Sequence, residues 1–243
     1  MSLELKVDIK GLNHRQRALA RIKGQVPYIM TETINRAGFA ARRSVIKEMG
    51  RVFDRPTRWI LKSPFFYKAT KHKMVGKLTL EEGRSKQGVT GWDILQPHIQ
   101  GGIRKPKRSE LALRRAGVLP DDMLTVPGRG ARIDRYGNMA SGQIVKILSY
   151  FRAYSEVGYV ANISAKRKAK LRERYFAVKK PKGNLQPGIY QVKRGRVVPL
   201  LIFVKQAMYR KRFDFVGVGT RAAQKKIKVA LPEIADYAIR TAR

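Results

Sequence analysis

Hydrophobic and polar positions alternate at the start of the chain. Within residues 3–9 every second side chain is aliphatic and its neighbours are charged, the period of two that is typical of a half-buried strand. After Gly11 the period changes, and residues 14–53 place apolar side chains every three or four positions, which predicts a long helix. Pro27 lies in this stretch and predicts either a kink or a helix start there.

Shorter elements are predicted in the middle of the chain. Residues 65–82 alternate apolar and basic side chains, which indicates one long strand or a hairpin. Residues 104–119 predict a short helix with Ser109 as its N-cap. Residues 120–140 are rich in turn-forming residues and predict a loop, and residues 141–150 then predict an amphipathic helix.

The last third of the chain returns to strands and ends in a helix. Residues 188–205 predict two strands around a basic turn, the second apolar enough to be central, while Pro199 indicates an edge position or a bulge. From Gly219 onward an apolar stripe at helical spacing predicts a terminal helix that is interrupted at Pro232.

The fold class predicted from these elements is α+β. Long helices at both ends surround a small antiparallel sheet, with extended basic loops or arms. We expect residues 1–243 to form a single domain, with residues 163–196 as a basic and extended segment, because that stretch holds twelve basic residues and one acidic residue.

Charge is the strongest compositional signal. The chain has 53 Lys and Arg against 17 Asp and Glu, a net charge of +36, so a polyanion or an acidic protein is expected as a partner. The absence of cysteine excludes disulfides, thiolate metal sites and thiol catalysis. No apolar run approaches the roughly 20 residues that span a bilayer, and we expect a protein made in a cytoplasm without a membrane partner.

Residues 126–151, VPGRGARIDRYGNMASGQIVKILSYF, raise the question of a phosphate-binding loop. A P-loop needs Lys and then Ser or Thr directly after its last glycine, and a dinucleotide fingerprint needs a third glycine at a helix start after a strand. Gly130 is followed by Ala, Arg and Ile, so the segment has neither the Lys and hydroxyl residue of a P-loop nor the third glycine of a dinucleotide fingerprint. The alternative is a shaped loop in which Asp134 bonds nearby backbone or an arginine, and a helix whose apolar face is core or subunit contact.

Other catalytic chemistry has little support in the sequence. None of the three histidines lies in an i, i+4 pair or near a carboxylate cluster, so no zinc site or general base is predicted. The pairs Glu81–Glu82 and Asp121–Asp122 leave a magnesium-dependent nuclease as a minor alternative. We therefore expect no enzyme activity, no catalytic residue, no metal, no cofactor and no small-molecule substrate.

Basic tracts are numerous enough to indicate contact with nucleic acid or with an acidic protein surface. Contacts of this kind are independent of sequence and sensitive to salt. The candidate contact residues are Lys166, Arg167, Lys168, Lys170, Arg172, Arg174, Lys179, Lys180, Lys182, Lys193, Arg194 and Arg196.

Three phrases of the sequence resemble a phage family. TETINRAGFAARRSVIKEM resembles the opening helix of bacteriophage and prophage minor tail proteins of the Z type, and RAGVLPDDMLTVPGRGARIDRYGNMASGQIVKILSYF resembles a segment of phage virion proteins. PLLIFVKQAMYRKRFDF with its terminal helix resembles their C-terminal part. The resemblance covers residues 31–66, 116–151 and 200–243, and it implies a virion protein of the head–tail junction or tail, for tail completion or as a neck connector, assembled as a ring.

This resemblance implies partners and contact surfaces but no catalytic residues. The expected partners are portal or connector proteins, a tail tube or tail terminator, further copies of the chain in a homo-oligomeric ring, and packaged DNA. The expected location is the virion, assembled in the host cytoplasm. Candidate inter-subunit contacts are Arg129, Arg132, Asp134, Tyr136, Ile144, Ile147, Leu148, Phe151, Tyr209, Arg210, Arg212 and Phe213. The alternative function is sequence-independent nucleic-acid binding, associated with packaging or with ribosomes.

Overall fold

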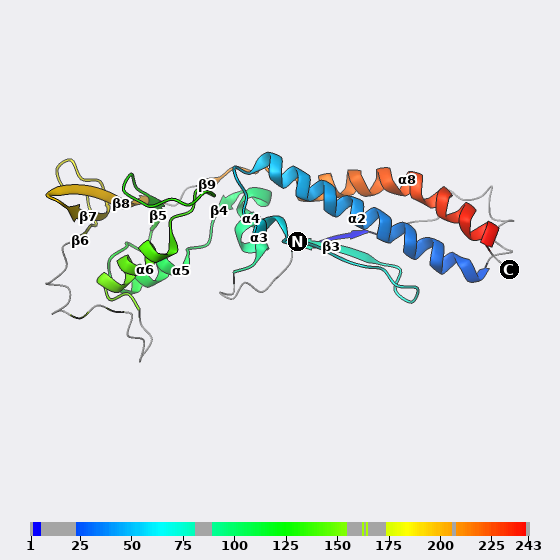
Figure 1. Cartoon of the computed structure of the whole chain (residues 1–243), viewed down its shortest axis with the longest axis horizontal. Helices are drawn as coiled ribbons and strands as arrows, with labels where there is room; N and C mark the ends of the chain where they lie inside the picture. Colours follow the sequence, from blue (N-terminus) through cyan, green and yellow to red (C-terminus); the bar gives the residue numbers. More distant parts are fainter. Residues whose placement is uncertain are drawn as a thin grey trace. The chain divides into compact units, whose positions relative to one another are not determined.

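The chain forms two compact units in the computed structural model, which describes residues 2–5, 23–80, 89–154, 162, 164, 174–205 and 208–241 (Figure 1). Unit 1 comprises Met1–Gly101 and Arg210–Arg243, and unit 2 comprises Gly102–Tyr209. The fold is α+β, with long helices toward both ends and small antiparallel sheets between them in the chain. The sequence indicated a single domain over residues 1–243, whereas the structure has unit 2 inserted between the two segments of unit 1.

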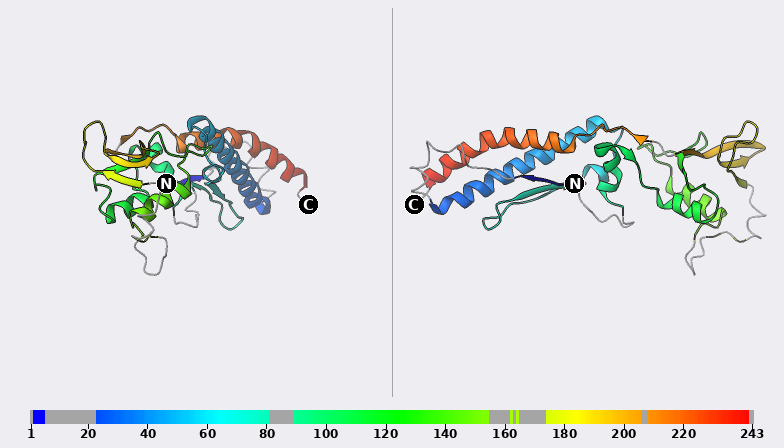
Figure 2. Two further views of the ribbon diagram at one scale, coloured as in Figure 1. Left: turned by 60° about the vertical axis from the view of Figure 1, so that its left-hand side comes forward. Right: turned by 180° about the vertical axis from the view of Figure 1, so that it is seen from behind.

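Two long helices build unit 1. Helix α2 (Val26–Val52) and helix α8 (Phe215–Thr241) lie side by side and antiparallel (Figures 1 and 2). Alanines at buried positions of both helices, among them Ala41 and Ala223, let the two backbones approach closely. Each helix is long, but no helix in the described part of the chain is apolar enough to cross a membrane.

The boundaries of these helices refine the sequence predictions. Pro27 lies in the first turn of α2 after the short 3-10 helix η1 (Lys23–Gln25), so it starts the helix. Helix α8 begins earlier than residue 219 and runs through Pro232 without interruption, so the predicted break is wrong. Pro232 is exposed, and the backbone bond it cannot form therefore falls on the solvent side of the helix.

A hairpin packs against α2 in unit 1. Strands β2 (Pro64–Tyr67) and β3 (Gly76–Leu80) pair antiparallel, with β1 (Ser2–Leu5) on the other side of β3, and this confirms the hairpin prediction. The Asn35 side chain donates to the Ala69 carbonyl at 3.2 Å and accepts from the Ala69 amide at 2.8 Å. Arg42 donates to the Pro64 carbonyl at 2.8 Å. Polar residues of α2 therefore fix the position of the hairpin.

The aromatic ring of Phe66 fits between two glycines. A Cβ on Gly38 of α2 would lie 2.0 Å from Phe66 Cζ, and one on Gly76 of β3 would lie 2.8 Å from the same atom. Phe66 is buried and its ring meets Phe39 edge to face at 5.3 Å. The close packing of α2 on the hairpin thus requires residues without a side chain at both positions.

Two short helices complete unit 1. Helix α3 (Arg58–Leu61) is capped by the Thr57 hydroxyl, which accepts from the Ile60 amide at 3.3 Å. Helix α4 (Gly91–Gln100) begins with a capping box between Thr90 and Asp93. Residues 6–22 and 81–88, including Glu81 and Glu82, lie outside the described residues.

Unit 2 is built on a four-stranded antiparallel sheet in the order β5-β8-β7-β6. Its strands are β5 (Met123–Pro127), β6 (Arg174–Val178), β7 (Gly188–Lys193) and β8 (Arg196–Lys205). Helices α5 (Arg108–Arg115) and α6 (Ser141–Tyr150) share one apolar core with this sheet. The two-stranded ladder β4 (Gly102–Ile103) and β9 (Met208–Tyr209) joins the ends of the unit.

The predicted strand pair of residues 188–205 is confirmed. Arg194 and Gly195 both have positive φ, as the two-residue turn between twisted strands requires. Strand β8 is central and has a register shift opposite Ile189 and Tyr190, where Pro199 lies. Pro199 therefore occupies a bulge in a central strand. Strand β5 lies inside the segment predicted as a loop, and α5 has Lys107 at its N-cap in place of Ser109.

Replacing Gly38 tests the packing of Phe66. We expect Gly38→Ala to lower the free energy of unfolding by about 1–3 kcal/mol, because the new methyl group overlaps the Phe66 ring. Gly50 is the matched control, since it lies in the same helix and a methyl group added there would have nothing within 4 Å, and Gly50→Ala should raise stability by about 0.5–1 kcal/mol. Urea unfolding measures both; equal effects of the two variants would contradict the packing argument.

Candidate functional site

The glycine-rich segment after β5 continues along the sheet. The Gly128 amide donates to the Leu200 carbonyl at 2.9 Å, and the Gly130 amide donates to the Pro199 carbonyl at 2.8 Å. The segment thus extends the pairing of β5 with β8 past the bulge at Pro199. The amides of both glycines are therefore used within the protein and are not available to bind an anion.

Close approach to β8 explains both glycines. A Cβ on Gly128 would lie 2.6 Å from the Pro199 carbonyl oxygen, and one on Gly130 would lie 2.3 Å from Val198 Cγ1. Any larger residue would push the segment off the strand. The spacing that suggested a phosphate cradle therefore serves packing against β8, and Arg129 between the glycines is exposed.

The tip of the loop is closed by Asp134. Its Oδ1 accepts from the Tyr136 amide at 2.8 Å and the Asn138 amide at 2.9 Å, which fulfils the prediction that this carboxylate bonds nearby backbone. The Asn138 amide and the other donors lower the pKa of Asp134. The Arg135 guanidinium lies over the Tyr136 ring, 4.8 Å from its centre. The loop is therefore a fixed turn that carries exposed cationic side chains.

Helix α6 braces the loop from the other side. The Gln143 side chain accepts from the Arg132 amide at 2.7 Å. Ile147 and Leu148 are buried in the core of unit 2, while Ile144 and Phe151 are half-buried against it. Of the two interpretations left open by the sequence, core and subunit contact, the structure places this apolar face in the core.

One buried carboxylate connects three parts of unit 2. Glu110 of α5 has no exposed surface and accepts five hydrogen bonds, from Arg104, the Lys107 amide and both the amide and the hydroxyl of Thr125, at 2.6–2.9 Å. Burial raises the pKa of Glu110, but the donors outweigh it and lower the pKa to about 2. The ion pair ties the segment after β4, the start of α5 and strand β5 together.

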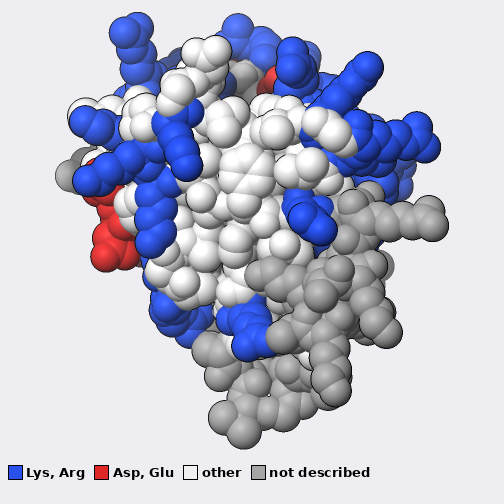
Figure 3. Space-filling model, turned by 90° about the vertical axis from the view of Figure 1, so that its left-hand side faces the viewer, with Lys and Arg blue, Asp and Glu red and all other residues white. Residues whose placement is uncertain are grey.

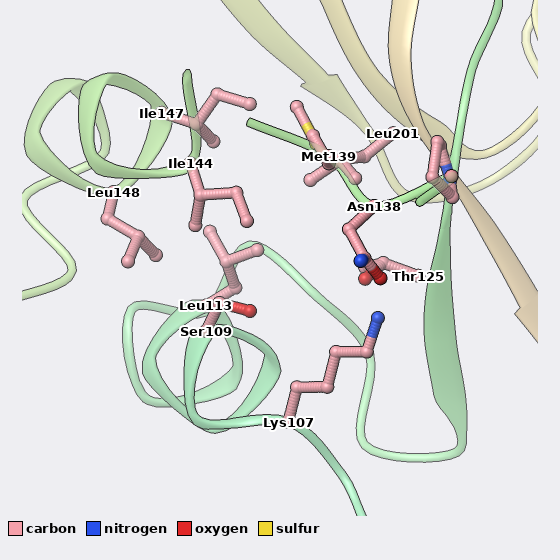
Figure 4. A pocket seen from close by; sticks show the side chains of 12 residues that line it. Lys107, Ser109, Leu113, Thr125, Asn138, Met139, Ile144, Ile147, Leu148 and Leu201 are labelled. Atoms are coloured by element: carbon pink, nitrogen blue, oxygen red, sulfur yellow. The ribbon is translucent and has the colours of Figure 1, made fainter. Parts of the chain in front are cut away.

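A cavity of about 220 Å³ lies between α5, α6, β5 and the loop (Figure 4). Its lining is mostly apolar, with four polar side chains, of which Lys107, Thr125 and Asn138 lie together and Ser109 lies beside Leu113 (Figure 4). The apolar lining residues include Leu113, Met139, Ile144, Ile147, Leu148 and Leu201. Nothing in the sequence pattern indicated this cavity, because its walls come from five separate segments.

The predicted basic contact residues fall into groups. The pairing of Arg174 with Val192 and of Lys193 with Arg196 places four of them at one end of the sheet. The connection between β6 and β7 holds another group. The four at the first end are Arg174, Lys193, Arg194 and Arg196; the second group is Lys179, Lys180 and Lys182; all seven are exposed. Lys166, Arg167, Lys168, Lys170 and Arg172 lie outside the described residues.

Figure 3 views the molecule from the side on which β6, β7 and β8 lie in Figure 1. Lys and Arg side chains surround an area of uncharged residues, and acidic side chains are few on this face. Unit 2 also exposes large apolar side chains, of which Ile133 and Val145 are nearly half exposed. Uncharged and cationic surface thus occur together, as at polar-rimmed binding sites.

The last four predicted subunit contacts, which lie within residues 209–213, are divided between the two units. Tyr209 lies in β9 of unit 2 and is half-buried. In unit 1, Arg210 is exposed, Phe213 is fully buried in the core, and Arg212 Nε donates to His98 Nδ1 at 3.1 Å. Burial, and then the Arg212 charge, lower the pKa of His98 to about 4. Arg212 and Phe213 therefore secure the chain before α8, and Arg210 is left at the surface.

Among the described residues, no group of His, Asp and Glu could hold a metal ion. Asp121 and Asp122 are exposed in the turn before β5. The features that define the site, namely Glu110, strand β5 and the cavity, were not identified from the sequence. A single glutamate among basic residues carries no distinguishing pattern, and its role depends on contacts with Arg104 and Thr125.

Acid should weaken unit 2 through Glu110. The pKa of Glu110 is about 2 in the folded protein, below its ordinary value of 4.5. Ionised Glu110 therefore adds about 3 kcal/mol to the free energy of unfolding above pH 4.5, and this stabilisation is lost as the pH falls toward 2. We expect Glu110→Gln to cost about 3–5 kcal/mol at pH 7 and to remove this acid dependence. The exposed Asp54–Arg55 pair supplies the control Asp54→Asn, which should leave the midpoint unchanged in urea unfolding at several pH values.

Replacing Gly130 should release the loop from β8. In Gly130→Ala the methyl group meets Val198, and the amide of residue 130 should exchange with solvent about tenfold faster or more. Gly142 of α6 has open space at the same position, so Gly142→Ala should leave exchange in the loop unchanged. If the amide of residue 130 exchanges as slowly in Gly130→Ala as in the wild-type protein, the role assigned to this glycine is contradicted.

Comparison with known proteins adds no relative. No protein-family model, no curated protein and no solved structure matches this chain. A functional inference therefore depends on the residues and geometry of the chain, together with the phage-like phrases of its sequence.

Proposed function

We propose that this protein is a non-enzymatic structural component of a phage or prophage virion, placed at the head–tail junction or in the tail. The observation that carries the proposal is the braced loop of residues 128–138, which presents Arg129, Arg132 and Arg135 from a fixed backbone on a strongly basic unit. The same segment is part of the resemblance to phage virion proteins. The loop contacts a neighbouring subunit or ring through these arginines.

A fixed loop suits assembly better than it suits catalysis. Binding costs less free energy when the contacting segment is already ordered, and arginine is among the residues that dominate interface energies. Exposed Asp134 has its carboxylate bonded to backbone within the loop, so the neighbour supplies the opposing charge. In a ring, each copy offers the same surface to the next, and acidic neighbours or packaged DNA balance the net charge.

The proposed partners follow from this location. They are further copies of the chain in a homo-oligomeric ring and portal, connector, tail-tube or tail-terminator proteins, in a virion assembled in the host cytoplasm. The contact surface comprises the loop arginines and Tyr136, with Arg210 as a separate exposed cation on unit 1. Ile147, Leu148 and Phe213 are not part of this exposed contact surface, because their side chains are buried.

Sequence-independent nucleic-acid binding is the second candidate. The sheet register supports it, because Arg174, Lys193, Arg194 and Arg196 converge on one end of the sheet and are all exposed. Binding through such a group would weaken steeply with salt, as condensed counterions are released from the nucleic acid. A fluorescent DNA titration at several salt concentrations tests this candidate, and a flat salt response would contradict it.

Charge reversal in the loop tests the assembly function. We expect the wild-type protein to sediment as a homo-oligomer and Arg129→Glu/Arg132→Glu to sediment as a monomer, because the loop contact is reversed in charge. The control Arg43→Glu/Lys47→Glu changes the net charge equally at exposed positions of α2 and should still assemble. Two observations together would overturn the proposal. They are a wild-type protein that sediments as a monomer at all concentrations, and a gene that has no capsid, portal or tail genes beside it.

A further inference from the structure

We propose that the cavity between α5, α6, β5 and the loop receives one large apolar side chain of a partner protein, from a segment in which that residue is flanked by carboxylates. This inference deepens the proposed assembly function, since it names the chemistry of the partner. It depends on the size of the cavity, the division of its wall, the position of Lys107 and the charge of unit 2.

The size of the cavity favours a side chain over a metabolite. Its volume of about 220 Å³ equals the space of roughly seven water molecules. Sites for whole small molecules usually have about 300–1,000 Å³. The cavity is therefore matched to an anchor residue such as Phe, Leu or Trp, the kind of residue that dominates binding energy when it fills a pocket.

The wall of the cavity is divided by polarity. In Figure 4, Leu113, Ile144 and Leu148 approach from α5 and α6 on one side, while the side chains of Lys107, Thr125 and Asn138 meet on the other. A ligand that fills both parts has an apolar body next to a polar group. An acidic peptide with one apolar anchor has this arrangement, because its carboxylates project from neighbouring residues of the same backbone.

Lys107 provides the charge at the polar side. Its amide is bound to Glu110, but its ammonium forms no ion pair with a carboxylate in the described part of the chain. The residue is exposed at the rim, while its ammonium end points toward Thr125 and Asn138 (Figure 4). Desolvation, and then the charge of Arg104, lower the pKa of Lys107, and the charge of the nearby Glu110 offsets only part of this lowering. A second carboxylate brought beside this ammonium would offset the rest.

Among the described residues of unit 2, few carboxylates could meet this charge. Glu110 is buried with its donors, and the Asp134 side chain is bonded to the loop backbone. Asp121 and Asp122 are exposed in the turn before β5 and do not line the cavity. The described part of unit 2 thus leaves the complementary charge to a partner, and the charge of the rim selects an acidic one.

Both sides of the cavity are held in place before a partner binds. The Glu110 network fixes the backbone at Lys107 and both the backbone and the hydroxyl of Thr125, and the Asp134 turn fixes the backbone at Asn138. The apolar side is the core packing of α5 on α6 and the sheet. Little ordering is needed on binding, so the filled cavity contributes to affinity without a large entropic cost.

A set of three short peptides tests the inference on the full-length protein. The probe is acetyl-Ser-Asp-Phe-Glu-Ser-amide; one control has Ala in place of Phe, and the other has Asn and Gln in place of the acidic residues. At about 0.15 M salt, we expect the Ala peptide to bind more weakly by about tenfold or more, from the loss of one buried aromatic side chain. Isothermal titration calorimetry measures the affinities.

Variants of the protein assign the binding to the cavity. Lys107→Gln should lower the affinity for the acidic Phe peptide several-fold and leave the affinity for the peptide with Asn and Gln unchanged. The control Lys146→Gln changes an exposed residue of α6 that does not line the cavity, and it should leave all three affinities unchanged. Ile144→Trp should fill the cavity and abolish the difference between Phe and Ala, with thermal unfolding as the check that the variant folds.

Two outcomes would overturn the inference. Equal binding of the Phe and Ala peptides would mean that the net positive charge alone attracts acidic peptides. Equal losses of affinity for the acidic Phe peptide in Lys107→Gln and Lys146→Gln would also mean that net charge alone causes the binding. Either result leaves the assembly function standing if the wild-type protein still sediments as a loop-dependent homo-oligomer, so failure of this inference and failure of the proposed function are separate observations.

Discussion

The buried carboxylate of Glu110 is the interaction on which unit 2 depends. A buried charge is tolerated only when it is paired and fully hydrogen-bonded, and Glu110 meets this condition through Arg104, Lys107 and Thr125. Each of these donors lies on a different segment, so satisfying one carboxylate positions all of them. Strand β5 is held against α5 in this way, and the loop after β5 begins from a fixed point. In a chain with so many cations, one acidic residue at the right place organises a whole unit.

The sequence predicted the elements whose patterns are long. Helix α2, the hairpin β2–β3 and the pair β7–β8 have clear periods, and the structure contains them. Strand β5 is five residues long and ends in Pro127, so its pattern is too short to distinguish it from a turn-rich loop. Its strand character depends on pairing with β8. The division into two units also depends on contacts between distant segments, which no local pattern carries.

The candidate site shows the same limit more sharply. Gly128 and Gly130 were singled out from the sequence, but the reason for them, the close approach to Val198 and Pro199, is a tertiary fact. The apolar face of α6 was predicted correctly as a face, and burial of Ile147 assigns it to the core. Arginines on the loop stay exposed in the structure. The physical cause in each case is that the residue types in a segment indicate its local conformation, whereas the residues that it contacts lie elsewhere in the chain.

The insertion of unit 2 into unit 1 has a consequence for the order in which the chain folds. The ladder between β4 and β9 pairs Gly102 with Tyr209, and paired strands lie about 4.8 Å apart. As the chain is synthesised, unit 2 is complete once β9 has emerged, while the apolar stripe of α2 still has no α8 to cover it. Closing the ladder then brings the end of unit 2 back to its start, which shortens the loop that α8 must close to reach α2 and lowers the entropic cost of that last step.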